Sequence, residues 1–204
     1  ITADQLYRQA HEYMGADNPL DDITVVVYTC ASFEALPKIQ HKPALPLEIS
    51  MKLTGAQLQD TGIVTRFVDT VCVDSAMAGI RSDMFTVLSE LFNNALEHGL
   101  LQLDSQLKAT EDGFLAYYNL RQSRLSGLDN AHIAIDYCYL PQSAKAIISV
   151  TDSGHGFDQA DLAQRSDSDG YGRGLCLVKG ICGDIQFSLG GRKATAVLSL
   201  PWAH

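Results

Sequence analysis

The 204-residue sequence is poor in basic residues, since 15 Lys and Arg stand against 24 Asp and Glu for a net charge of −9. Surfaces that bind nucleic-acid backbones or anionic membranes need clustered Lys and Arg, so neither is an expected partner. No apolar run approaches the roughly 18 residues of a membrane span, and no signal peptide is recognisable. Membrane proteins and general nucleic-acid binders are therefore disfavoured.

Cysteine is scarce and irregularly spaced. The five cysteines are odd in number, lie in apolar surroundings and form no CxxC pair. This set favours reduced core residues over a disulfide framework or a zinc site. We therefore expect a cytoplasmic protein.

What the sequence does have is enough apolar residues, 46%, for one core plus an appendage. A helix is predicted over 2–13 and a β-branched strand over 23–28, followed by a proline-containing stretch over 33–46 that is typical of a linker. Hydrophobic periodicity predicts the remaining elements. These are a strand over 47–53, helices over 54–74, 83–99 and 113–127, strands over 133–140 and 146–151, a helix over 174–182 and a hairpin over 184–200.

Polar side chains interrupt the helix predicted over about 83–99. At about 100° per residue, Glu90, Asn94 and Glu97 fall within roughly 60° of one another. Asn is a poor helix-interior residue, so Asn93 and Asn94 suggest selection for function, and Gly99 suits a helix C-terminus. The opposite side is expected to face the core and carries Phe85, Leu88, Phe92, Ala95 and Leu96.

Two glycine-rich runs and a threonine follow later in the chain. The run from Asp152 to Gly156 (DSGHG) follows an apolar strand, where the Asp152 carboxylate can accept a hydrogen bond from an exocyclic amine or merely cap a glycine turn. The run from Gly170 to Gly174 (GYGRG) precedes a helix whose N-terminal N–H groups can bind phosphate. Thr195 opens the last strand, either to reach a phosphate or as a β-favouring surface residue.

In this order and spacing, the motifs resemble the N-box, G1 box, G2 box and final threonine of the GHKL ATPase superfamily, over about residues 47–204. Glu90, four residues before Asn94, with His98-Gly99 just beyond, resembles the anti-sigma-factor serine protein kinases of bacterial partner-switching systems. The resemblance implies an α+β fold, a two-layer α/β sandwich with a mixed, mostly antiparallel sheet covered by helices on one face. It also implies ATP and Mg²⁺ as cofactors.

The resemblance further implies residue roles. Glu90 would be the general base, Asn94 the Mg²⁺ ligand and Asp152 the partner of the adenine amine. Glu97 stays open between a functional acid and a solvated surface acid. The other residues implied at the nucleotide are His98, which orients the N-box or binds, Gly154 and Gly156 beside the base, Gly172 and Gly174 around the triphosphate, Arg173 at the γ-phosphate and Thr195 in the pocket wall.

The N-terminal part carries a second resemblance. Residues 18–27 (NPLDDITVVV) resemble the closing motif of PPM-type, metal-dependent serine/threonine phosphatases. The expected domains are a phosphatase remnant over 1–32, a linker over 33–46 and the GHKL-type domain over 47–204. The latter has an insertion at about 100–130, which is a partner or dimer surface or an extra core-packing helix. The chain begins at Ile1, so we expect a segment of a longer protein, with a receiver (response-regulator) domain upstream as a family inference.

Two functions are compatible with these patterns. The first is a serine protein kinase that phosphorylates an anti-sigma-factor antagonist of the STAS type, with a homodimer and a directly bound sigma factor as further family expectations. The second is an ATP-bound module that sequesters a partner without significant kinase activity. A histidine kinase is disfavoured, because neither His11 nor His41, the only upstream histidines, lies in a long dimerising helix.

Overall fold

The structure, a computed structural model, describes residues 2–14, 26–27, 45–73, 75–104, 107, 111–156 and 173–200. The chain divides into two compact units, Ile1–Gln40 and His41–His204. In the first unit, α1 (Ala3–Met14) confirms the helix predicted over 2–13. The predicted strand over 23–28 and the phosphatase-like run lie outside the described residues except for Val26 and Val27, which are exposed and not in a strand.

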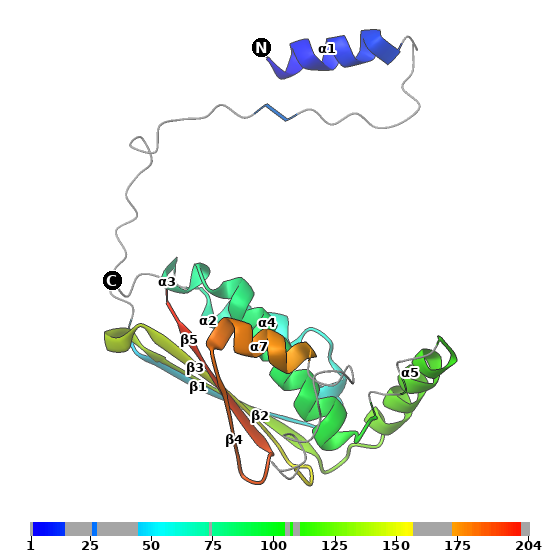
Figure 1. Ribbon diagram of the computed structural model, residues 1–204, viewed down its shortest axis with the longest axis vertical. Coiled ribbons are helices and arrows are strands. Elements are labelled where there is room, and N and C mark those ends of the chain that lie inside the picture. Colours follow the sequence, from blue (N-terminus) through cyan, green and yellow to red (C-terminus); the bar gives the residue numbers. More distant parts are fainter. Residues whose placement is uncertain are drawn as a thin grey trace. The chain divides into compact units, whose positions relative to one another are not determined.

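The second unit is built on a sheet whose described strands number five, in the order β1-β2-β3-β5-β4. Every described pair is antiparallel, and α2, α4 and α7 cover one face (Figure 1). The fold is therefore α+β with helices over an antiparallel sheet, as the sequence predicted in outline. The strands are β1 (Leu47–Thr54), β2 (His132–Leu140), β3 (Lys145–Asp152), β4 (Ile185–Ser188) and β5 (Lys193–Ser199).

Two helices of this unit lie close to their predicted positions. The predicted helices over 113–127 and 174–182 are confirmed as α5 and α7. The helical elements of this unit are η2 (Gly55–Gln59), α2 (Ile63–Val71), α3 (Ser75–Ala78), α4 (Arg81–Asn93), the π-helical η3 (Asn94–Leu100), α5 (Glu111–Leu125), the short η5 (Pro141–Ser143) and α7 (Arg173–Cys182).

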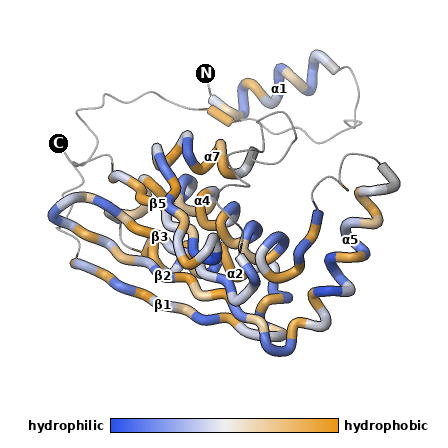
Figure 2. The backbone as a smooth tube through the Cα atoms, turned by 60° about the horizontal axis from the view of Figure 1, so that its bottom comes forward, coloured by the Kyte–Doolittle hydropathy of each residue, from blue (hydrophilic) through white to orange (hydrophobic). Residues whose placement is uncertain are grey.

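Strand alternation builds the core between the sheet and its helices. Along β2, the odd-numbered residues from Ile133 to Tyr139 are buried, whereas the even-numbered ones are more exposed. Their neighbours on β3 that face the same side, Ile148 and Val150, are also buried. Figure 2 shows hydrophilic and hydrophobic residues alternating along these strands. Side chains of odd and even positions point to opposite faces, so one face of the sheet is apolar and covered.

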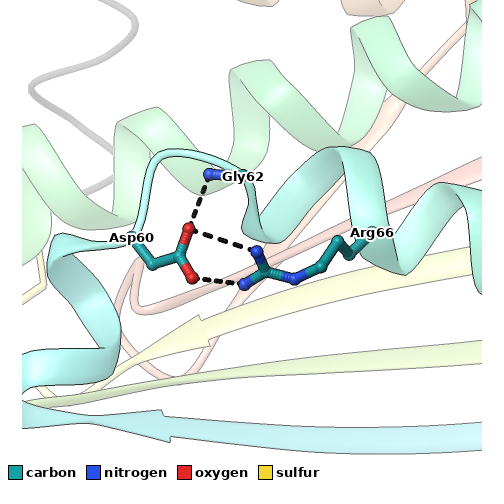
Figure 3. Close-up of polar contacts among 3 residues, drawn as sticks. All are labelled: Asp60, Gly62 and Arg66. Atoms are coloured by element: carbon teal, nitrogen blue, oxygen red, sulfur yellow. Dashed lines mark hydrogen bonds and ion pairs between the residues drawn. The ribbon is translucent and has the colours of Figure 1, made fainter.

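The single helix predicted over 54–74 is wrong, because the chain breaks it after Gln59. The backbone N–H of Thr54 donates to Gln57 Oε1 at 2.9 Å, as part of a capping box at the start of η2. Asp60 then accepts the Gly62 N–H at 2.8 Å and pairs with Arg66 (Figure 3). The hydrogen bond from Arg66 holds the pKa of the exposed Asp60 carboxyl below its ordinary value. Asp60 thus lies in the turn that separates η2 from α2, which begins at Ile63 after Gly62.

The core side of α4 differs in one residue from the prediction. Met84 and Leu88 are fully buried, whereas Phe85 is 39% exposed. Leu88 and Phe92 confirm the predicted apolar side. Because α4 is covered by α2 and α7 as well as by the sheet, several directions around the helix are buried, and a single apolar stripe does not describe it.

The described cysteines are all free thiols, as expected for a reduced protein. Cys72 and Cys182 are partly buried and pack against the core, as predicted. The prediction of a core position is wrong for the exposed Cys176 and for Cys138, whose even-numbered position on β2 faces away from the core. Within the described ranges, no helix has both the length and the apolar character needed to cross a bilayer.

Candidate functional site

The helix that carries the N-box-like residues changes its hydrogen-bond pattern at Asn94. Up to Asn93 it is α-helical, and from Asn94 to Leu100 it forms a π-helical turn, in which Leu101 N–H reaches back five residues to Leu96 O at 2.8 Å. Such turns are rare and frequently occur at functional sites. Gly99 therefore lies inside the turn, and the prediction that it ends the helix as a C-terminal glycine is wrong.

Glu90 faces the start of α7. A Cβ atom on Gly174 would lie 2.0 Å from Glu90 Oε2 and 2.8 Å from its Cδ, so the carboxylate occupies the space that any larger residue would need. Glu90 is half-buried. Only a glycine at position 174 permits this approach, because it alone has no Cβ. The structure thus brings Glu90 together with Gly174 of the second glycine-rich run.

Asn94 lies one helical turn beyond Glu90, on the same helix. Its side-chain nitrogen, Nδ2, is buried and has no hydrogen-bond partner among the described residues. A buried polar group without a partner is costly and is rare in native structures. A carboxamide carries both donors and an acceptor, so Asn94 has an N–H₂ and an oxygen with which to meet a bound group.

Asp152 packs against the other end of the same helix. It ends β3, is 7% exposed, and its Oδ1 accepts the Gly154 N–H at 2.8 Å. A Cβ on Gly99 would lie 2.7 Å from Asp152 Cγ, and one on Gly154 would lie 2.1 Å from Gly99 O. Two glycines therefore allow the strand end and the π-helical turn to touch. Burial raises the pKa of the Asp152 carboxyl, an effect that the hydrogen bond from Gly154 partly opposes.

Gly156 and His98 are held by neighbouring backbone. Gly156 has φ +75°, and a Cβ there would lie 2.0 Å from Gly190 O, in the turn between β4 and β5. His98 Nδ1 lies 3.0 Å from Leu103 O. A carbonyl oxygen only accepts, so Nδ1 carries the hydrogen in this contact. This bond supports the orienting role for His98.

Thr195 is not brought together with Asp152. It pairs with Ser149 across β5 and β3, and the two hydroxyl oxygens are 2.9 Å apart. Ser149 and Asp152 are three residues apart on one strand, so their side chains point to opposite faces. Val150, of the same parity as Asp152, is in the core, which places Thr195 on the face that the helices do not cover. The structure therefore does not place Thr195 in the same pocket as Asp152.

Two predicted phosphate-binding residues fall outside what the structure describes. Gly172 lies outside the described residues, as does the side chain of Arg173, whose backbone opens α7. The predicted contacts of these two residues stay predictions. Of the second glycine-rich run, Gly174 alone is described with its surroundings.

Glu97, predicted to share a face with Glu90 and Asn94, is turned toward α5 instead. Its Oε2 accepts the Tyr117 hydroxyl at 2.5 Å, and its Oε1 accepts Arg121 Nε at 3.1 Å. Its side chain is 17% exposed, so the interpretation as a solvated surface acid is wrong. Sequence reasoning missed this contact, although Tyr117 and Arg121 lie four residues apart on a predicted helix, which gives them a common face.

The helix α5 in the insertion at 100–130 is buried on one side and exposed on the other. Tyr117 and Leu125 are buried, whereas Phe114, Leu115 and Tyr118 are at least half exposed. Figure 1 shows α5 beyond the end of the α4–η3 helix and not over the sheet. The predicted core-packing role is therefore observed, and the partner or dimer surface stays a prediction.

The described part of the chain thus places Gly174 against Glu90 and Asp152 against Gly99, at the two ends of the helical segment that carries Asn94 and His98. Glu90 and Gly174 are 84 positions apart in sequence. In comparisons with known proteins, no family model matches the chain and no curated protein matches it.

Proposed function

We propose that the unit His41–His204 binds Mg²⁺ and ATP between the α4–η3 helix, the loop after β3 and the start of α7, and transfers the γ-phosphate to a serine of an anti-sigma-factor antagonist of the STAS type. The setting would be cytoplasmic partner switching in a bacterium, with a homodimer as the working form. One observation carries the proposal. Three motifs that are distant in sequence meet on one helix, with Gly174 against Glu90 and both Gly99 and Gly154 against Asp152.

The residues present fit a magnesium-bound nucleotide. Asn94 is partly buried, its Nδ2 has no partner among the described residues, and its carboxamide oxygen is available in principle as a ligand. Oxygen ligands are what Mg²⁺ prefers, and it usually takes only one or two from protein and the rest from phosphates and water. When bound, Mg²⁺ and ATP supply the transferable phosphoryl group and the neutralisation of its charge. Asn94 is thus the residue that would hold the metal.

Glu90 is suited to act on the incoming hydroxyl. It lies one turn before Asn94 and remains half-buried beside the N-terminus of α7. A carboxylate in hydrogen-bond reach of a serine hydroxyl can orient it and accept its proton. In this role Glu90 holds the proton that the serine loses, and Gly174 keeps the space beside the carboxylate open.

Asp152 is suited to recognise the base. Its carboxylate is buried at a strand end and accepts from Gly154 N–H through one oxygen. A buried acceptor of this kind selects for a donor such as the exocyclic amine of adenine, because leaving it without a donor costs free energy. We expect the Asp152→Asn variant to lose affinity for ATP and to keep its affinity for inorganic pyrophosphate, which has no base.

Phosphotransfer and binding must be measured separately in the 204-residue chain. We expect Glu90→Gln to keep Mg²⁺-dependent ATP binding, measured by calorimetry. Its rate of ³²P transfer to a purified anti-sigma-factor antagonist should fall at least 100-fold, because a general base contributes about 100-fold or more to a rate. Asn94→Ala should lose Mg²⁺-dependent binding. Asp83→Asn, an exposed acid on the same helix, is the control and should change neither.

Three outcomes separate the alternatives. Undiminished transfer by Glu90→Gln contradicts the role as general base. Wild-type chain that binds ATP and the antagonist without transferring phosphate is a binding module that sequesters its partner, as the second sequence-based hypothesis holds. Wild-type chain that does not bind ATP overturns the whole proposal.

A further inference from the structure

The carboxylate of Glu97 is held by two donors from α5. The Tyr117 hydroxyl and Arg121 Nε occupy its two oxygens at 2.5 and 3.1 Å. Tyr117 is fully buried, and the side chains of Glu97 and Arg121 are 17% and 23% exposed. Hydrogen bonds to an ionised acceptor are about twice as strong as neutral ones, and low exposure protects them from screening by salt. This cluster is therefore a firm link between α5 and η3.

Glu97 is placed where such a link affects the candidate site. It lies three residues after Asn94 and two before Gly99, within the same π-helical turn. Its backbone carbonyl also accepts Leu103 N–H at 2.8 Å, so both its side chain and its main chain are held. A π-helical turn is an uncommon conformation that persists where surrounding contacts determine it. The contacts from α5 determine it at this residue.

A second contact runs from α5 toward the loop of Asp152. Arg124 Nη1 donates to Leu101 O at 2.6 Å and to Gln102 O at 2.9 Å. Gln102 has φ +49°, a conformation that few residues other than glycine adopt, and its Nε2 lies 2.9 Å from His155 Nδ1. His155 stands between Gly154 and Gly156. Arg124 thus supports a strained residue that contacts the first glycine-rich run.

We infer that α5 is a positioning helix for the candidate site, with Tyr117 and Arg121 as positioning residues that act through Glu97. The helix fixes the π-helical turn that carries Asn94 and Gly99. Its effect on ATP rests on the proposed function, whereas its effect on the backbone of η3 does not. The two effects therefore need separate measurements.

Amide hydrogen exchange of the full chain measures the effect on η3 without a nucleotide. Tyr117→Phe removes one hydroxyl from the cluster, and Tyr118→Phe, one residue along the same helix and 50% exposed, is the matched control. We expect Tyr117→Phe to speed exchange at residues 94–103 by about ten-fold, the effect of one lost hydrogen bond to an ionised group, and to leave exchange in β3 unchanged. Arg121→Met should act in the same direction, and Tyr118→Phe should have no effect.

Two results would overturn the inference. An equal rise of the exchange rate in β3 and in residues 94–103 would show that Tyr117 stabilises the whole unit. An unchanged exchange rate in both would show that its hydroxyl does not hold η3. If wild-type chain binds Mg²⁺-ATP, Tyr117→Phe should also weaken that binding by about five-fold, and unchanged affinity would contradict positioning of the site. If wild-type chain does not bind, the proposed function fails, and the exchange measurement still decides the role of α5.

Discussion

The carboxylate of Glu90 lies where the side chain of residue 174 would begin, since a Cβ on Gly174 would be 2.0 Å from Glu90 Oε2. The two residues belong to different helices, α4 and α7, and are 84 positions apart. The clash is with the far end of a flexible side chain, so a larger residue at 174 is expected to move the carboxylate and not to unfold the protein.

The first prediction follows from this contact. Gly174→Ala should reduce phosphotransfer by at least ten-fold, while its unfolding free energy in urea changes by less than about 1 kcal/mol, because alanine also favours helix. The control is Gly180→Ala on the same helix, where no atom lies within 4 Å of the added Cβ. It should keep full activity. Equal activity of the two variants would show that the position of the Glu90 carboxylate does not matter.

The second prediction concerns the backbone contact between Gly154 and Gly99. A Cβ on Gly154 would lie 2.1 Å from Gly99 O, and backbone cannot rotate away as a side chain can. We expect Gly154→Ala to lower the unfolding free energy by about 1–3 kcal/mol, the usual cost of overpacking. Gly127→Ala, where the nearest atom is Arg124 O at 3.7 Å, should be within about 1 kcal/mol of wild type. Urea unfolding of both variants measures the difference, and equal stability would contradict a rigid contact.

The third prediction is a pH dependence at Asp152. Burial raises the pKa of this carboxyl above its ordinary value of 3.8, so over an acidic range the folded state holds a proton that the unfolded state has released. The wild-type protein therefore loses stability as pH rises from the pKa that Asp152 has in the unfolded state to the one it has in the folded state. At higher pH the loss stays constant. Asp152→Asn lacks this loss. Its unfolding free energy relative to wild type should rise with pH through this range and then level off.

Urea unfolding of both proteins between about pH 3 and pH 7 measures this difference. A relative stability that falls with rising pH would mean that Gly154 N–H and the nearby Arg192 stabilise the ionised carboxylate by more than burial costs it. Nucleotide must be absent, because a bound ligand would add its own pH dependence.

The fourth prediction tests the face on which Thr195 lies. Thr195→Val should leave the affinity for Mg²⁺-ATP within about two-fold of wild type and lower the unfolding free energy by about 1–2 kcal/mol, because the buried Ser149 hydroxyl loses its partner. The double variant with Ser149→Ala should recover part of that loss, as a double-mutant cycle would show. A folded Thr195→Val variant with greatly reduced ATP affinity would instead place Thr195 at the nucleotide.

Local sequence was sufficient for much of the fold. Strand alternation and helix signals predicted β2, β3, α5 and α7 to within about two residues, because these elements follow the period of their own apolar residues. The break at Asp60 was missed, since the hydrophobic pattern continues through it, whereas the chain turns there with the Asp60 carboxylate bonded to Gly62 N–H and Arg66.

The sequence by itself determined which residues are available for the site, namely Glu90, Asn94 and Asp152, together with the glycines that permit close approach. Only the tertiary structure decided what each of them meets. Gly99 looked like the end of a helix and instead makes room for Asp152. A helical projection assumes a constant rotation per residue, and the π-helical turn at Asn94 breaks that assumption, which is why Glu97 binds Tyr117 and Arg121 and does not join Glu90. Likewise, a strand's register with its neighbours decides the face of Thr195, and that register is a long-range property that no local pattern contains.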